Sequence, residues 1–234
     1  MRKMQRKILS FSFLKYSVVI FLALFGGCTG PDNKTPNEPD QPHFTEIRTS
    51  DTFIHAPTGM EFPAEVAGFK RTKILQYDQQ GANVGVEYAL DYFGFPIAEV
   101  TVYIYPDETT PGLGPVSLEK HYDELRALLF NIYSDAHDLE DGEIKIGQPF
   151  GPQRGLMFKF TYHPPRLFKS QLCYAKLYLF KYGPWFIKYR LTDPVKDDVK
   201  VDIEFKKLLQ MLTWPQLANV DSNQPDVITP ITPE

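Results

Sequence analysis

Apolar and polar residues alternate over several stretches of this chain, and the alternation restricts the fold more than any other feature of the sequence. Residues 84–90 read VGVEYAL, residues 100–105 read VTVYIY and residues 156–162 read LMFKFTY. Successive side chains of a strand point to opposite faces, so each stretch predicts a strand with one face against a core. Residues 172–182 and 185–191 predict two more strands, separated by Gly183-Pro184.

Two other stretches have the period of a helix. Their apolar positions are Leu118, Tyr122, Leu125, Leu129 and Ile132 in the first, and Val201, Phe205, Leu208 and Leu212 in the second. Steps of three and four place these side chains on one face of a helix. Ser117 is the expected N-cap of the first helix. Asp193-Pro194 is the expected start of the second, and Trp214-Pro215 its end.

The order of these elements is strands, helix, strands, helix. Connections such as Asp78-Gln79-Gln80-Gly81 are turns, too short for the crossover that parallel strands need. The sequence therefore predicts an α+β fold, in which a mostly antiparallel sheet is covered by two main helices as an α/β/α sandwich.

The stretch GFKRTKILQYDQQGANVGVEY and the stretch WFIKYRLTD, followed by a helix that ends at Trp214, give a layout that resembles the PsbP/Mog1-like domains. The resemblance covers roughly residues 50–215 and contains no diagnostic motif. It implies a hairpin at the start, a helix in mid-chain, and strands with a helix at the end. It also implies a non-enzymatic binding or assembly role, and it transfers no functional residue.

The N-terminus has the layout of an export signal. Five basic residues and no acidic residue lie within positions 1–15, and an apolar run follows from Tyr16 to Phe25. The sequence Leu24-Phe25-Gly26-Gly27-Cys28 then resembles the bacterial lipobox, in which the Cys is acylated and the chain is cut before it. Thr29 stands where an Asp often marks inner-membrane retention in Gram-negative lipoproteins. We therefore expect an envelope lipoprotein in the outer membrane, facing the periplasm.

Two alternatives to this interpretation stay open. A spanning helix needs about 20 apolar residues, but Lys15 interrupts the window from Ile8 to Gly27. An ordinary secretory signal would make Cys28 incidental.

Removal of residues 1–27 takes away five Lys or Arg residues and no acid, so the formal charge changes from −4 to −9. This charge argues against nucleic acid as a partner. Residues 28–48 are polar and rich in Pro, which predicts a tether, and residues 217–234 predict a disordered tail. A single domain is expected between them, at residues 49–216.

No catalytic or cofactor motif is found. The sequence lacks G-x-S-x-G, HExxH and P-loop patterns, and we expect no cofactor and no metal. The segment DAHDLEDGE at residues 135–143 lacks the spacing of a calcium loop and predicts an exposed helix-to-strand connection. If Cys28 is acylated, Cys173 has no partner, and its apolar surroundings favour a buried thiol over a reactive one.

Aromatic side chains suggest a recognition surface. Tyr103 and Tyr105 lie opposite the aliphatic face of their strand, so they pack beneath a helix or face a partner. The loop from Tyr162 to Gln171 adds Arg166 beside aromatic residues. We therefore expect Tyr103, Tyr105, Tyr162 and Arg166 to contribute to partner binding.

Two functions follow from these features. The first is a membrane-anchored binding or assembly module, held in the bilayer by acylated Cys28, that contacts an envelope protein or a small ligand. The alternative is an envelope hydrolase whose site is assembled from distant residues, with His137 or His163 and nearby carboxylates as candidates.

Overall fold

The computed structural model of the 234-residue chain describes residues 44–107, 116–164, 168 and 171–216. In these ranges nine strands form one antiparallel sheet, in the order β1-β5-β6-β7-β11-β10-β9-β8, with β4 paired to β5. The strands are β1 (Thr45–Glu46), β4 (Glu65–Val66), β5 (Phe69–Gln76), β6 (Val84–Tyr92), β7 (Phe95–Pro106), β8 (His137–Ile146), β9 (Gln153–Tyr162), β10 (Cys173–Tyr182) and β11 (Trp185–Pro194). A separate hairpin joins β2 (Phe53–His55) to β3 (Met60–Phe62).

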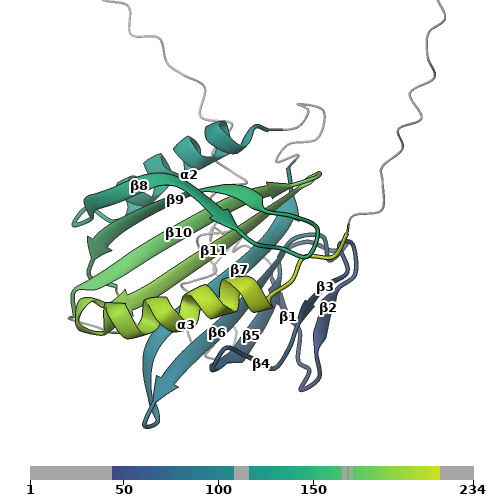
Figure 1. Ribbon diagram of the computed structural model, residues 1–234, viewed down its shortest axis with the longest axis horizontal. Coiled ribbons are helices and arrows are strands. Elements are labelled where there is room, and N and C mark those ends of the chain that lie inside the picture. The colour runs from purple at the N-terminus through teal and green to yellow at the C-terminus, as the bar shows by residue number, and fades with distance from the viewer. Residues whose placement is uncertain (1–43, 108–115, 165–167, 169–170, 217–234) are drawn as a thin grey trace, which may run out of the picture.

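Two α-helices cover opposite faces of the large sheet, and Figure 1 shows the sheet between them. They are α2 (Leu118–Ile132) and α3 (Asp198–Met211), the latter preceded by the 3-10 turn η3 (Val195–Asp197). The fold class predicted from the periodicities is confirmed: the chain is an α+β domain with a mostly antiparallel sheet and two helices. The helices in the described ranges do not have the length and apolarity that a bilayer crossing requires.

Strand alternation divides the core between the two helices. In β11, Ile187, Tyr189 and Leu191 join the cluster that includes Val201, Phe205 and Leu208 of α3. Phe186, on the other face of β11, joins the cluster that includes the apolar stripe of α2. A single strand therefore supplies both cores, as the period of two requires.

Local signals position α2. The hydroxyl of Ser117 accepts a hydrogen bond from the backbone N–H of Lys120 at 3.2 Å, so the N-cap prediction is confirmed. Leu118, Tyr122, Leu125 and Leu129 are buried against the sheet, as their spacing predicts. The hydroxyl of Tyr122 also donates to the backbone carbonyl of Met157 at 3.0 Å, which ties the helix to β9.

An ion-pair network attaches α3 to its face of the sheet. Lys176 of β10 has 2 % side-chain exposure, and its Nζ lies 3.3 Å from Oδ1 of Asp193 and 2.6 Å from Oδ1 of Asp202. The amine also pairs with Asp198, whose carboxylate binds Lys159 at 3.0 Å. Removal of one partner from a buried pair leaves an uncompensated charge, so these contacts fix where α3 lies.

Three sequence expectations need correction. Asp193 is not the N-cap of α3: it belongs to β11, and the helix begins at Asp198. The acidic segment at residues 135–143 is not a simple connection, because most of it forms β8, the exposed edge strand. The folded domain also begins before residue 49, since β1 pairs with β5. The proposed signal peptide and tail lie outside the described residues.

Candidate functional site

The three tyrosines predicted to face a partner lie in the core. Tyr103 is 2 % exposed, Tyr105 is 3 % exposed and Tyr162 is 2 % exposed, and all three belong to the cluster under α2. The structure therefore contradicts the exposed placement and agrees with the alternative, packing beneath a helix. The covering helix explains the burial, because its apolar stripe occupies this face. Arg166 and Cys28 lie outside the described residues.

Two basic side chains that were not among the sequence predictions lie between these tyrosines. Lys188 and Arg190 project from β11 on the face of Phe186, with 1 % and 9 % of their surface exposed. Lys188 Nζ lies 4.1 Å from the centroid of the Tyr103 ring and 5.5 Å from that of Tyr105. Such distances permit cation–π attraction, which strengthens when water is excluded.

Arg190 and Lys188 together form a polar layer on this face of β11. The Nη2 of Arg190 donates to the hydroxyl of Tyr133 at 2.8 Å, and the hydroxyl of Tyr162 lies 3.5 Å away. Tyr133 is at the C-cap of α2, so this contact joins the end of the helix to the middle of the sheet. The guanidinium therefore positions α2 in addition to its role in the polar layer.

Burial changes the protonation of this layer. Burial, with Arg190 nearby, lowers the pKa of Lys188 to about 7. Burial, with the charge of Lys188 nearby, lowers the pKa of His121 to about 3. His121 Nε2 forms a 2.7 Å hydrogen bond with the hydroxyl of Tyr105. His121 is therefore uncharged at neutral pH.

Polar side chains on the neighbouring strands β7 and β6 continue the polar layer towards β5. Thr101 of β7 pairs with Glu87 of β6 on one side and with Arg190 on the other. Burial raises the pKa of the Glu87 carboxyl. The amine of Lys73, whose Nζ lies 4.0 Å from Oε2 of Glu87, acts in the opposite direction and lowers this pKa. Burial likewise raises the pKa of Glu99. Perturbed pKa values often cluster at functional sites, and they also occur in structural networks.

The next cross-strand row is closed by aromatic packing. Tyr103 pairs with Gly85 on one side and with Lys188 on the other. A Cβ on Gly85 would lie 3.2 Å from the Tyr103 ring, so glycine leaves the space that the ring occupies. Tyr77 stacks on Tyr103 with ring centroids 6.4 Å apart. The described side chains thus pack this row as part of the core.

The four histidines in the described residues do not converge on one place. His55 and His121 are buried on different parts of the domain, and His137 begins the exposed strand β8. His163 pairs with Asp135 at 2.9 Å, with more than two fifths of each side chain exposed. Among the described residues, no hydrogen bond joins this pair to the side chain of a Ser, Thr or Cys that could act as a nucleophile. His43 lies outside the described residues.

Metal and thiol chemistry find no support in the described ranges. No group of three or more His, Cys, Asp or Glu side chains there has the arrangement of a metal site. Cys173 is fully buried, and burial raises the pKa of its thiol to about 12. A thiol in this environment stays protonated, which agrees with the expectation of a structural residue.

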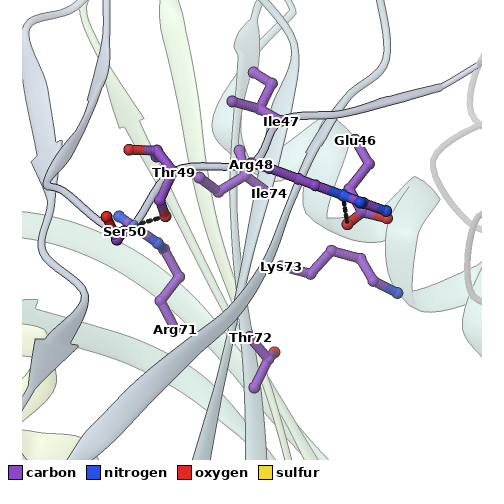
Figure 2. A pocket seen from close by; sticks show the side chains of 9 residues that line it. All are labelled: Glu46, Ile47, Arg48, Thr49, Ser50, Arg71, Thr72, Lys73 and Ile74. Atoms are coloured by element: carbon purple, nitrogen blue, oxygen red, sulfur yellow. Dashed lines mark hydrogen bonds and ion pairs between the residues drawn. The ribbon is translucent and has the colours of Figure 1, made fainter.

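A shallow groove of about 470 Å³ lies between residues 46–50 and β5. Figure 2 shows its lining, in which Arg71 points towards Ser50 and Arg48 pairs with Glu46. Arg71 is already occupied, because it donates to the backbone carbonyls of Phe62, Thr49 and Asp51. The groove is therefore the contact between residues 46–50 and β5, and Arg71 stabilises this contact.

The turn between β6 and β7 exposes a compact aromatic group. Phe93 is 84 % exposed, Phe95 is 74 % exposed and Tyr92 is 50 % exposed. Tyr92 pairs with Phe95, so Phe93 and Gly94 form a two-residue turn. The rings of Tyr92 and Phe93 lie 4.3 Å apart. We call residues 92–95 the aromatic hairpin tip.

The outer surface of α3 extends this apolar area. Lys200 Nζ lies 2.9 Å from the centroid of the Tyr92 ring, which places the first half of α3 beside the tip. Val199 is 77 % exposed and Ile203 is 54 % exposed. These two residues lie four apart on the helix, and Ile203 is three residues after Lys200, so all three share a face. The tip and this helix face are therefore neighbours, and the Lys200 amine lies over the Tyr92 ring.

Signals for both regions were present in the sequence. FGFP predicted only a break between strands, yet a Gly within this short break is typical of a two-residue hairpin turn. In WFIKYRL, the bases at alternate positions of an apolar strand indicate a charged strip within one face. Burial of that strip could not be inferred without the position of α2.

Comparisons with known proteins add no functional assignment. Neither the family models nor the curated proteins include a match to this chain. A solved structure of a protein of unknown function, PA94 from Pseudomonas aeruginosa, aligns with 13 % identity and a TM-score of 0.41. The alignment covers 75 % of this chain and 99 % of that chain. A likeness at this level carries no argument about function.

Proposed function

We propose that the chain is a lipid-anchored protein of the bacterial cell envelope whose domain is a non-enzymatic binding or assembly module. The basic N-terminal segment, the apolar run and the Leu24–Cys28 lipobox support the anchor. Acylated Cys28 holds the chain in the outer membrane, on the periplasmic side. Several acyl chains on one protein give stable attachment without a spanning helix.

The observation that carries the binding role is the surface formed by the aromatic hairpin tip and the adjacent face of α3. Large contiguous apolar areas are uncommon on soluble monomers, where they mark contact sites. Aromatic side chains contribute large contact areas at a low entropic cost, since they have few rotatable bonds. The domain therefore contacts another envelope component through this surface.

Fatty-acid labelling in a bacterial host tests the anchor. Cys28→Ser abolishes the label and leaves an unprocessed precursor, because the acceptor thiol is missing. Cys173→Ser is the matched control, since this buried Cys leaves labelling unchanged. A mature chain that starts elsewhere and carries no acyl group contradicts the proposal.

A photo-crosslinking residue at position 95 tests the surface. We expect crosslinks from this position to envelope components in intact cells. The same probe at position 150, where Phe150 is 53 % exposed at the β8–β9 turn, is the control and is expected to give none. Equal crosslinking from both positions, or none from position 95, argues against a dedicated contact surface.

A further inference from the structure

The backbone of the aromatic hairpin tip is strained to keep a phenyl ring at the turn. Phe93 has φ +52° and Gly94 has φ +80°. Two-residue turns with positive φ at both positions favour Asn or Asp before Gly, and a bulky side chain in this region costs free energy. Such strain is characteristic of functional sites, so the ring at position 93 calls for a role beyond folding.

The tip is convex and open. A Cβ on Gly94 would meet no other atom within 4 Å. Figure 1 shows the β6–β7 turn projecting beyond the neighbouring strand ends, beside α3. A projecting turn that carries two exposed phenyl rings suits insertion into a soft apolar medium.

We propose that the aromatic hairpin tip inserts into the interfacial region of the lipid bilayer to which the chain is anchored, with Val199 and Ile203 of α3 lying against the same surface. This inference rests on the proposed lipid anchor and names the component that the exposed surface contacts. The amphipathic rings of Tyr and Trp prefer the headgroup region, and apolar side chains such as Phe are buried at the boundary between headgroups and acyl chains.

The length of the sequence between the anchor and the fold permits this contact. Seventeen peptide steps separate Cys28 from Thr45, which span at most ~60 Å when fully extended. Thr45 pairs with Gln76, at the end of β6 opposite to the tip, and the nine residues of β6 cover ~30 Å. The chain can therefore reach past the sheet and leave the tip against the bilayer.

The lipid anchor also favours the bilayer, rather than a protein, as the partner of the aromatic hairpin tip. An anchored domain stays within a few nanometres of the bilayer, so the local concentration of lipid is high and a second, weak contact forms readily. The charges around the tip are mixed, with Asp91 on β6 and Lys200 on α3. The contact therefore depends on apolar insertion more than on the attraction of anionic headgroups.

Fluorescence quenching by brominated lipid measures insertion directly. The chain from residue 28 to residue 234 with Cys28→Ser carries no acyl group, so any contact arises from the domain itself. Phe93→Trp is introduced in one variant and Phe150→Trp in the control, and both keep the native Trp185 and Trp214. The probe is a vesicle of phosphatidylethanolamine and phosphatidylglycerol that contains acyl-brominated phospholipid.

We expect brominated vesicles to quench the indole introduced at position 93 and to leave the indole introduced at position 150 unchanged. A second variant, Phe93→Ser with Phe95→Ser, is expected to reduce the vesicle-bound fraction about tenfold or more, since two phenyl rings no longer leave water. Its circular dichroism spectrum should match that of the parent chain, because both side chains are exposed.

Two results would overturn the inference. One is an unquenched indole in the Phe93→Trp variant, with vesicle binding that the double Ser variant does not change. The other is the same lack of quenching together with crosslinking to an envelope protein that disappears in the double Ser variant. This result would identify a protein as the partner of the tip. Because quenching is measured without an acyl group, it is independent of the Cys28 labelling result, and failure of either proposal can be told from failure of the other.

Discussion

The two ends of β7 carry the same class of side chain in opposite environments. Tyr103 and Tyr105 lie near its C-terminal end with 2 % and 3 % of their surface exposed, and Phe95 begins the strand with 74 % exposed. The difference comes from what covers each end. The cluster under α2 encloses the two tyrosines, while Phe95 lies next to the β6–β7 turn, which projects past the neighbouring strands. Hydrophobicity alone therefore does not separate core from contact surface.

The comparison also separates stability from function. Aromatic rings in the core lower the free energy of the folded state through burial and packing. Rings at the projecting tip contribute little to folding, and at Phe93 the backbone conformation opposes it. Substitutions at the two ends should accordingly affect different measurements.

The largest expected effect is at the buried end. Tyr105→Ala should lower the free energy of unfolding by about 3–5 kcal/mol, because it opens a cavity and removes the hydrogen bond to His121. Phe95→Ala should change it by less than about 0.5 kcal/mol. Urea titration of both variants measures the difference, and similar losses at both ends would break the comparison.

The pH dependence of Lys188 is the next effect. Its pKa is about 7 in the folded chain, against an ordinary 10.5. Between these values the unfolded chain binds more protons than the folded chain, so this group makes stability rise with pH by up to ~1.4 kcal/mol per unit. Below about pH 7 both states are protonated and the full penalty of burying the charge remains.

Lys188→Met should therefore stabilise the domain most below pH 7, with a gain that shrinks as the pH approaches 10. Unfolding titrations at about pH 6, 8 and 10 measure this trend. Lys206→Met, at an exposed position on α3, is the matched control, and its effect is subtracted at each pH. A gain from Lys188→Met that does not depend on pH would show that the amine keeps its ordinary pKa.

A smaller effect isolates one hydroxyl. Tyr105→Phe keeps the ring and removes the donor or acceptor opposite His121 Nε2, which leaves a buried polar atom without that partner. The expected loss is about 1–2 kcal/mol in the free energy of unfolding. Tyr92→Phe at the exposed tip should have almost no effect on stability. Equal effects of the two substitutions would contradict the assigned difference in burial.

The smallest effect has the opposite sign. Phe93→Asn places the favoured Asn-Gly pair at positive φ, so the domain should gain about 0.5–1 kcal/mol. The same substitution should weaken vesicle binding. A gain in stability with a loss of binding would show that the strained backbone at Phe93 is kept for contact with the bilayer. A variant that is less stable and binds vesicles as before would show that the backbone conformation at Phe93 has no role in membrane contact.

Periodicity was sufficient to predict most of the fold. Alternation identified the central strands, and the step of three and four identified both helices, because burial on one face imposes these periods. Asp193 was misassigned because Asp-Pro is also a helix-start signal, and only the buried pair with Lys176 shows why it stays in β11. The acidic run at β8 lacks apolar alternation, as a charged edge strand can.

The candidate surfaces were less accessible from the sequence. Which face of a strand receives a helix depends on tertiary packing, so Tyr103 and Tyr105 were compatible both with a core under a helix and with a partner surface. The polar layer of Lys188 and Arg190 depends on cross-strand register over β6, β7 and β11. No local pattern encodes this register. The exposure of Phe93 depends in turn on the length of the neighbouring strands.

The most direct test of the lipid-anchored envelope module is the mass of the mature N-terminus. The protein is extracted from bacterial membranes with detergent, and its N-terminal peptide is analysed by mass spectrometry. The proposal predicts a chain that begins at Cys28 and carries acyl groups on that residue. A mature chain that begins at another residue, or an unmodified Cys28, would contradict it.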